Sequence, residues 1–213
     1  MKISILNTSE QHPINPWLHK WITQNSEHQI SLIRSKEQLQ SGDLLFLISC
    51  EEIVTAADRE KFVKTLVIHA SDLPNGRGWS PHVWALLAGA EELVVSLLEA
   101  EDKVDTGDVW SKLKIKIPKT ALYDEINSLL FSAELQLMDF AIQNFNTVKP
   151  AKQSLQGSVS YWPKRTPKDS ELDIDKTINE QFNLLRVSDP NRFPAFFYKE
   201  GKKFLLKIEA VDE

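Results

Sequence analysis

A chain of 213 residues that is 42% hydrophobic and 26% charged can bury one substantial core, with room for a small appendage. Its formal net charge of -5 argues against general nucleic-acid binding, which favours strongly basic surfaces. Cys50 is the single cysteine, which excludes a disulfide framework and a cysteine-based metal site. The apolar stretch at residues 3–6 is too short for a secretion signal and no segment approaches a membrane span, so we expect a soluble, cytoplasmic protein.

The first half of the chain alternates between strand-like and helix-like patterns. Short apolar runs predict strands at residues 2–7, 29–33, 43–48 and 65–68. Apolar residues at helical spacing predict helices at residues 16–23 and 56–63. Such alternation is typical of βαβ units, so we predict an α/β fold with a mostly parallel, Rossmann-like sheet.

The second half continues this pattern and then changes in composition. We predict a helix at residues 80–87, a buried strand at 93–98, a half-solvated strand at 109–117, and a long helix capped by Thr120. A polar segment at residues 146–156 predicts a boundary between a domain of residues 1–150 and an extension of residues 151–213. The extension is predicted to form a helix at residues 174–185 and a hairpin of residues 193–198 and 202–208, turning at Glu200 and Gly201.

Chemically capable side chains follow three of the predicted strands. His69 directly follows the fourth strand, Asp105 lies beyond the fifth, and the third leads into Ser49, Cys50 and Glu51. Because ligands bind at the carboxyl ends of parallel strands, we expect these side chains to converge at one edge of the sheet. Each also has a structural interpretation, since a lone strand-end histidine is more often structural and Asp-Thr-Gly is a turn-forming sequence. The remaining histidines show no metal-ligand spacing, so we predict no metal site.

Two separated motifs carry a family resemblance. The sequence HASDLPNGRGWSPHVWALLAG begins at His69, and LLEAEDKVDTGDV follows it. This combination resembles the folate-dependent formyltransferases, in which a histidine precedes a Ser-x-Leu-Pro turn and an Arg-Gly-x-x-Pro helix start, and an Asp-Thr-Gly-Asp loop comes later. The resemblance covers residues 43–109 well. The later sequences YWPKRTPKDSELD and RVSDPNRFPAFF are similar to the branch of the family that formylates nucleotide-linked sugars, including the N-formyltransferase of the pseudaminic acid pathway.

The resemblance implies roles for individual residues. His69 and Asp105 would be catalytic, and 10-formyltetrahydrofolate would be the formyl donor, bound by Ser49, Cys50, Glu51, Ile53, Val104, Thr106 and Gly107. The acceptor and its diphosphate would be met by Arg77, Lys164, Arg165, Arg186 and Arg192. The chain departs from the family pattern at Val67, where the family has an asparagine that helps to hold the formyl oxygen. Ser71, backbone N–H groups or a residue of the C-terminal tail are the alternatives for that role.

The expected reaction is formyl transfer to the 4-amino group of a nucleotide-linked 4-amino-4,6-dideoxy sugar. The UDP-linked altrose derivative of pseudaminic acid synthesis is the best single candidate. The chain lacks the large C-terminal barrel of the initiator-tRNA formylating enzymes, so we expect small-molecule partners and neither nucleic acid nor membrane. Two alternatives remain open: glycinamide ribonucleotide formyltransferase, and a folate- or nucleotide-binding module that has lost catalysis, which Val67 suggests. The oligomeric state is not predicted.

Overall fold

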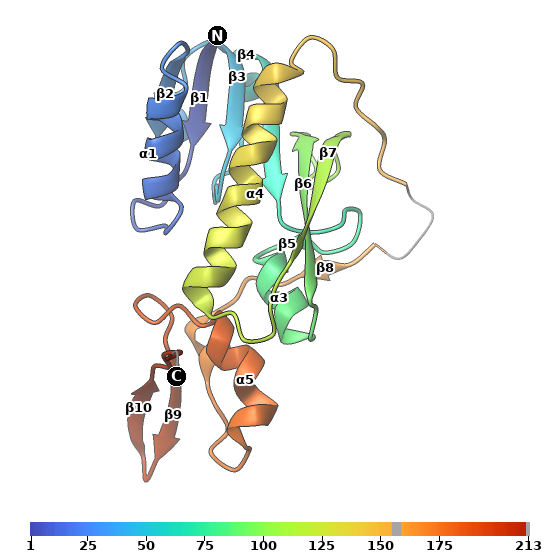
Figure 1. Cartoon of the computed structure of the whole chain (residues 1–213). Helices are drawn as coiled ribbons and strands as arrows, with labels where there is room; N and C mark the ends of the chain where they lie inside the picture. Colours follow the sequence, from blue (N-terminus) through green and yellow to red (C-terminus); the bar gives the residue numbers. More distant parts are fainter. Residues whose placement is uncertain (155–158, 212–213) are drawn as a thin grey trace.

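One six-stranded sheet forms the centre of the computed structural model, which describes residues 1–154 and 159–211 (Figure 1). In their order across the sheet, the strands are β2 (Gln29–Ile33), β1 (Lys2–Leu6), β3 (Gly42–Leu47), β4 (Phe62–His69), β6 (Glu92–Glu99) and β7 (Val109–Lys116). The first four run parallel to one another, whereas β6 is antiparallel to both of its neighbours. The prediction of an α/β fold with a mostly parallel sheet is therefore confirmed.

Two helices, α1 (Asn15–Gln24) and α4 (Tyr123–Gln143), cover the same face of this sheet (Figure 1). The largest cluster of buried apolar side chains lies between these helices and the sheet, and it includes Phe46 of β3. Trp21 of α1 stacks edge-on against Phe46, and its Nε1 donates a hydrogen bond of 2.6 Å to Asp139 of α4. The two helices are thereby joined to each other as well as to the sheet.

Loops and one short helix, α2 (Ala56–Arg59), cover the opposite face. Here a smaller apolar cluster forms around Leu45 and Leu47, because successive residues of β3 point to opposite faces. The predicted helix at residues 56–63 is too long, because Phe62 is already buried in β4 and pairs with β3. Residues 56–59 alone remain for the helix.

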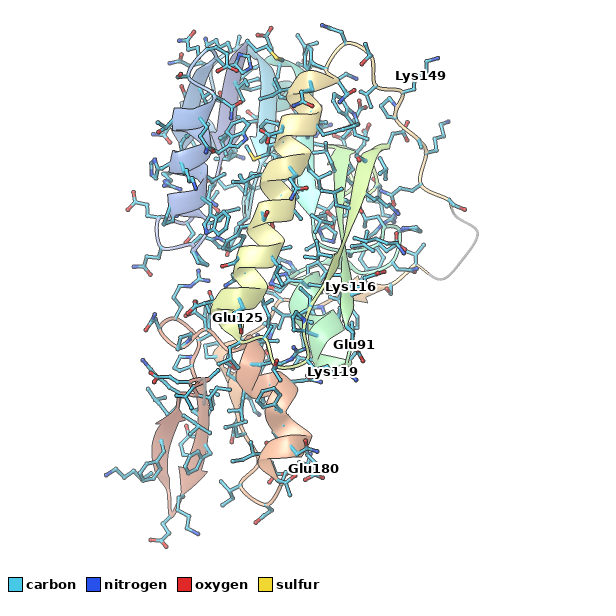
Figure 2. The ribbon with its side chains drawn as sticks, in the orientation of Figure 1. Glu91, Lys116, Lys119, Glu125, Lys149 and Glu180 are labelled. Carbon is cyan, nitrogen blue, oxygen red and sulfur yellow. The ribbon has the colours of Figure 1, made fainter. Side chains whose placement is uncertain are left out.

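The predicted starts of two further helices are wrong by a few residues. Helix α4 is not capped by Thr120, since it begins at Tyr123 and the carboxylate of Glu125 accepts a 3.0 Å hydrogen bond from the Leu122 N–H group. Helix α5 (Ile178–Val187) starts after the predicted residue 174, because the Thr177 hydroxyl caps it by accepting from the Glu180 N–H group. Local hydrogen bonds, rather than the apolar stripe, therefore set both starts. Glu125 and Glu180 lie at the surface in Figure 2.

After α4 the chain returns along the sheet to the region of His69. We call the described part of this stretch, residues 149–154 and 159–163, the return segment; residues 155 and 156 of the predicted boundary lie outside the described residues. Within it, β8 (Tyr161–Trp162) pairs in parallel with β5 (Arg77–Gly78). Trp84 of α3 (Pro81–Leu87) stacks on Trp162 with ring centroids 5.7 Å apart, which fixes α3 against the return segment.

The remaining residues form α5 and the hairpin of β9 (Ala195–Lys199) and β10 (Lys202–Leu206), which lie below the sheet in Figure 1. Glu200 and Gly201 both have positive φ angles, as a tight turn requires, so the predicted hairpin is confirmed. An exposed ion pair of 2.8 Å joins Lys119 to Glu91, and the two residues lie close together in Figure 2. No helix among the described residues is long and apolar enough to cross a membrane.

Candidate active site

His69 is the last residue of β4, and its side chain is buried. Its Nε2 atom lies 2.8 Å from the carbonyl oxygen of Gly76, and its Nδ1 atom lies 3.5 Å from Oδ1 of Asp105. Both ring nitrogens therefore face oxygen atoms. When each nitrogen carries a proton, both can donate, and the carboxylate stabilises the resulting charge.

Asp105 reaches His69 by a route that the sequence did not reveal. Strand β6 is antiparallel to β4, so its carboxyl end at Glu99 lies opposite Leu66 rather than beside His69. The following loop folds back, and Asp105 takes a left-handed conformation with φ of 58° within it. Its Oδ2 accepts a 2.9 Å hydrogen bond from the Gly78 N–H group. The expected pairing with His69 exists, but the shared carboxyl edge is the wrong reason for it.

Gly107 permits this return of the loop. A Cβ atom at this position would collide with the backbone carbonyl of Glu99. A backbone group cannot rotate away as the end of a flexible side chain could. The N–H group of Glu99 also donates to the carbonyl oxygen of Asp108 at 2.9 Å, which closes the loop at its base. The predicted folate contact at Gly107 is thus accompanied by a structural requirement for glycine.

The return segment holds the loops that carry Gly76, Asp105 and Gly107 through two residues that sequence reasoning missed. Gln153 donates from Nε2 to the carbonyl oxygens of Asp105 and Gly107, both at 2.9 Å, and its Oε1 accepts from Arg77 at 2.6 Å. Ser160 accepts a 2.8 Å hydrogen bond from the Gly76 N–H group. These contacts join residues 46 to 84 positions apart, so no local pattern indicates them.

Arg77 is therefore buried beneath the return segment. Its Nη1 donates to the hydroxyl of Tyr161 at 3.2 Å, and this hydrogen bond is the main cause that lowers the pKa of Tyr161. We predicted Arg77 to contact the acceptor or the folate, whereas the structure surrounds its guanidinium with Gln153 and Tyr161. Its position braces the loop next to His69.

The two loops predicted to bind folate lie side by side. Arg59 joins them, because it donates to the carbonyl oxygen of Val54 at 2.9 Å and pairs with Asp102 at 2.6 Å. Ile53 on the first loop and Val104 on the second are 64% and 55% exposed, which is unusual for apolar residues of this size. Two exposed apolar side chains, one on each loop, could thus flank a flat ring. Cys50 and Thr106 lie on the same loops, where each contacts a nearby backbone carbonyl.

A separate cavity of about 200 Å³ lies beside the first three turns of α4, and we call it the α4 pocket. Its α4 wall consists of Tyr123, Asn127, Leu130, Phe131 and Glu134. Other walls carry residues that we predicted for two different ligands: Ser49 and Glu51 for folate, and Lys164, Arg165 and Arg192 for the acceptor. The structure thus brings these five side chains to one cavity.

The basic residues differ in how they are paired. Lys164 pairs with Glu51 at 2.8 Å, and Arg192 pairs with Asp189 at 2.6 Å. Arg165 forms no ion pair with a described residue, and its buried Nε has no hydrogen-bond partner among them. Arg186 is not brought to the cavity. It is 2% exposed and donates to the carbonyl oxygens of residues 118 and 119, so it connects α5 to the segment between β7 and α4.

Burial shifts the pKa values of three side chains in this pocket. It raises the pKa of Glu134 to about 8, so this carboxyl group is protonated at neutral pH. It lowers the pKa of His82 to about 4, with added repulsion from His12, His69 and Arg165. It also lowers the pKa of His12 to about 4, helped by the charge of Arg192. No group of three or more side chains among the described residues is arranged to hold a metal ion.

Comparison with known proteins identifies relatives. A family model described as "Formyl transferase" matches residues 5–142. The methionyl-tRNA formyltransferase of Natranaerobius thermophilus is 35% identical over 150 residues, covering 68% of this chain and 46% of the relative. That of Streptococcus suis is 29% identical over 187 residues, covering 81% and 58%. The chain therefore spans about half the length of these curated relatives.

Solved structures share the fold at lower sequence identity. A methionyl-tRNA formyltransferase from Clostridium thermocellum has a TM-score of 0.82 at 20% identity, covering 100% of this chain and 94% of that one. A 4-N formyltransferase from Francisella tularensis has a TM-score of 0.76 at 16% identity, covering 100% and 98%. HypX from Aquifex aeolicus, in complex with tetrahydrofolic acid, has a TM-score of 0.80 at 23% identity, covering 98% and 37%.

We predict that the free energy of unfolding is greatest near pH 6.5. His12 and His82 take up protons on unfolding below their ordinary pKa of 6.5, so together they lower stability as pH falls toward 4. Glu134 loses its proton on unfolding above its ordinary pKa of 4.5 but keeps it in the folded protein up to about pH 8. It therefore lowers the unfolding free energy by about 1.4 kcal/mol per pH unit between these values. Above pH 6.5 this decline is no longer offset by the two histidines.

Urea unfolding between pH 4 and 8.5 measures this profile. In Glu134→Gln, the decline between pH 6.5 and 8 should disappear. Asp124→Asn removes a carboxylate from the exposed side of the same helix and should retain the decline. The same decline in Glu134→Gln as in the unchanged protein would show that another group causes it.

Proposed function

The protein belongs to the formyl transferase family, whose model matches more than half of the chain, and we propose that it transfers a formyl group from 10-formyltetrahydrofolate to an amine. The observation that carries this proposal is the buried contact between His69 and Asp105. It lies beside the loop of residues 99–107, which Arg59 connects to the loop of residues 49–54. An acid–base pair beside two connected loops that each expose an apolar side chain fits acyl transfer from a flat, ring-containing donor.

The reaction requires two proton movements and stabilisation of one negative charge. The acceptor amine attacks the formyl carbon, and the carbonyl oxygen becomes an oxyanion. The bond from this carbon to N10 of the folate then breaks, and the proton lost by the amine is delivered to N10. His69 serves as the proton carrier, with Asp105 orienting the ring and balancing its charge. Since Nε2 contacts the Gly76 carbonyl, the formyl oxygen must compete with that carbonyl for the same N–H group.

His69→Asn and Asp105→Asn should each lower kcat by about 100-fold or more, while the fold is retained. Asparagine tolerates the left-handed backbone of residue 105, so the second variant removes the charge with little strain. His19→Asn, at an exposed position of α1, is the matched control and should keep full activity. Steady-state release of tetrahydrofolate measures the rates, and circular dichroism checks the fold. Near-native turnover by folded His69→Asn would contradict the assignment.

Ser71 is the best candidate to take over the role of the missing asparagine. Val67 lies in an apolar cluster with Cys50, Val54 and Ala100, so its side chain offers no hydrogen bond. Two residues beyond His69, the buried hydroxyl of Ser71 has no hydrogen-bond partner among the described residues. A buried hydroxyl without a partner is costly unless it serves a ligand. We therefore assign it the formyl oxygen.

Ser71→Ala should lower kcat by about 100-fold, the usual loss for one oxyanion donor. Adding Val67→Asn to this variant should restore part of the lost activity, because it returns an amide donor to the family's position. The measurement is kcat for the single and double variants. Wild-type turnover in Ser71→Ala would show that a backbone N–H group or a tail residue holds the oxygen instead.

We place the pterin of the folate between Ile53 and Val104. Arg59→Ala should separate the two loops and raise the Kd for tetrahydrofolate by about tenfold, because the free protein would have to order both loops on binding. Lys61→Ala removes a nearby ion pair with Asp58 that does not connect the two loops, and it should leave the Kd unchanged. Calorimetric titration measures these values. If Ile53→Ser and Arg59→Ala both bind tetrahydrofolate normally, the donor lies elsewhere.

For the acceptor, we propose a nucleotide-linked 4-amino-4,6-dideoxy sugar, with the UDP-linked altrose derivative as the first compound to test. Support comes from the resemblance of the C-terminal sequence to the sugar branch and from Lys164 and Arg165 beside the α4 pocket. Methionyl-tRNA is the second candidate, because the curated relatives carry that name.

The acceptor assay compares UDP-, GDP- and dTDP-linked 4-amino sugars with glycinamide ribonucleotide and charged initiator tRNA. We expect the largest kcat/KM for one of the nucleotide-linked sugars. More efficient formylation of the tRNA or of glycinamide ribonucleotide would reject the sugar while leaving the formyltransferase chemistry intact. Folate binding without transfer to any of these acceptors would favour a binding module.

A further inference from the structure

The wall that α4 contributes to the α4 pocket combines polar and apolar side chains. Asn127, Leu130, Phe131 and Glu134 follow the i, i+3, i+4, i+7 spacing of one helix face. Leu130 and Phe131 are almost fully buried, as expected for a core helix. Asn127 and Glu134 are each only 8% exposed, yet both are polar. Burying polar groups on an otherwise apolar face costs stability, so packing alone does not account for them.

Asn127 has unused hydrogen-bonding capacity, and burial is the cause that raises the pKa of Glu134, with no hydrogen bond from a described residue contributing. Nδ2 of Asn127 has no partner among the described residues. Glu134 lies 7 positions further along, which places it about 10 Å away along the helix axis. A ligand that meets both side chains must therefore be longer than a single functional group. The apolar surface of Phe131 between them suits the flat or carbon-rich face of a ring.

The charge around the pocket favours an anionic group at one position. Lys164 and Arg192 are each paired with a carboxylate, whereas Arg165 forms no ion pair with a described residue. Its Nε is buried and lacks a partner among these residues. Burial lowers the pKa of Arg165, and the charge of Asp169, whose carbonyl oxygen accepts from Nη2 at 3.0 Å, offsets this only in part. A guanidinium in this state is suited to bind phosphate.

We propose that the α4 pocket is the acceptor subsite, in which Asn127 and Glu134 hydrogen-bond a hydroxylated ring and Arg165 binds the phosphate attached to that ring. The inference rests on the proposed function, because it assigns this ligand to the acceptor. The cavity of about 200 Å³ is smaller than the roughly 300–1,000 Å³ of pockets that enclose drug-sized ligands. It therefore encloses one ring and leaves the rest of the acceptor outside.

The protonated form of Glu134 suits this role. Its hydroxyl can donate to the ligand while its carbonyl accepts, and it adds no negative charge beside a phosphate. His12 and His82 in the same pocket are neutral at pH 7, and the pairs Glu51–Lys164 and Asp189–Arg192 are internally balanced. Tyr123, which donates to Asp189, stays protonated, because burial raises its pKa to about 12. Ionisation of Glu134 above pH 8 should therefore weaken binding of the phosphorylated ligand.

Calorimetric titration of the full chain without folate tests this proposal independently of formyl transfer. The probes are UMP, ribose 5-phosphate and inorganic phosphate at pH 7. We expect at least one of the two phosphorylated rings to bind more tightly than phosphate alone by about tenfold or more, because hydrogen bonds to the ring are added. UMP binding without ribose 5-phosphate binding identifies the ring as part of a nucleoside. Equal affinities for all three probes overturn the proposal.

Variants then assign the contacts. Glu134→Leu and Asn127→Leu should each weaken ring binding by about tenfold, whereas Gln136→Leu on the exposed side of α4 should not. Arg165→Met should reduce the affinities for the ring phosphate and for phosphate alone by similar factors. If Glu134→Leu does not fold, Glu134→Gln provides the test, because its affinity should stay constant between pH 7 and 9 while that of the unchanged protein falls. Wild-type affinity in the leucine variants overturns the proposal. So does an affinity of Glu134→Gln that falls between pH 7 and 9 as much as that of the unchanged protein. Ring binding without any formyl transfer would reject the proposed function alone.

Discussion

The double attachment of the Asp105 carboxylate is the constraint on which the rest of the site depends. One oxygen faces the His69 ring and the other accepts from the Gly78 N–H group, so a single side chain positions both the imidazole and the loop that follows it. This attachment requires a loop that turns back after β6, which Gly107 permits by its lack of a side chain. Gln153 then donates to the carbonyl groups of Asp105 and Gly107. The geometry of the site results from loops that constrain one another, with the sheet supplying only His69.

Much of the architecture follows from local patterns. The strand predicted at residues 29–33 has the same limits as β2, and the hairpin turn at Glu200 and Gly201 is where the sequence indicates it. The helix starts are predicted less accurately. Leu122 and Thr177 cap α4 and α5 through hydrogen bonds to glutamates, and apolar periodicity does not detect such bonds. Periodicity reports which face is buried, and it contains little information about where a segment begins.

The site was predictable to the extent that its residues lie within short motifs. His69 and Asp105 lie in such motifs, but Asp105 does not follow a parallel strand, because β6 runs antiparallel to β4. Gln153, Ser160 and Glu134 were not identified, since each acts through contacts with residues far along the chain or across a cavity. Arg186 looked like a phosphate ligand because its charge is visible in the sequence, whereas its burial against backbone carbonyls is not.

The pairing of β5 with β8 also determines the order in which the protein is assembled during synthesis. All six strands of the central sheet precede residue 117, and α4 completes its main cover by residue 143. The loop after His69, however, forms several of its hydrogen bonds with Gln153, Ser160 and Trp162, up to 84 residues later. Domains fold in N- to C-terminal order as they leave the ribosome. The sheet can thus form while the loop after His69 still lacks these later partners, so the geometry around His69 is completed only after the return segment has emerged.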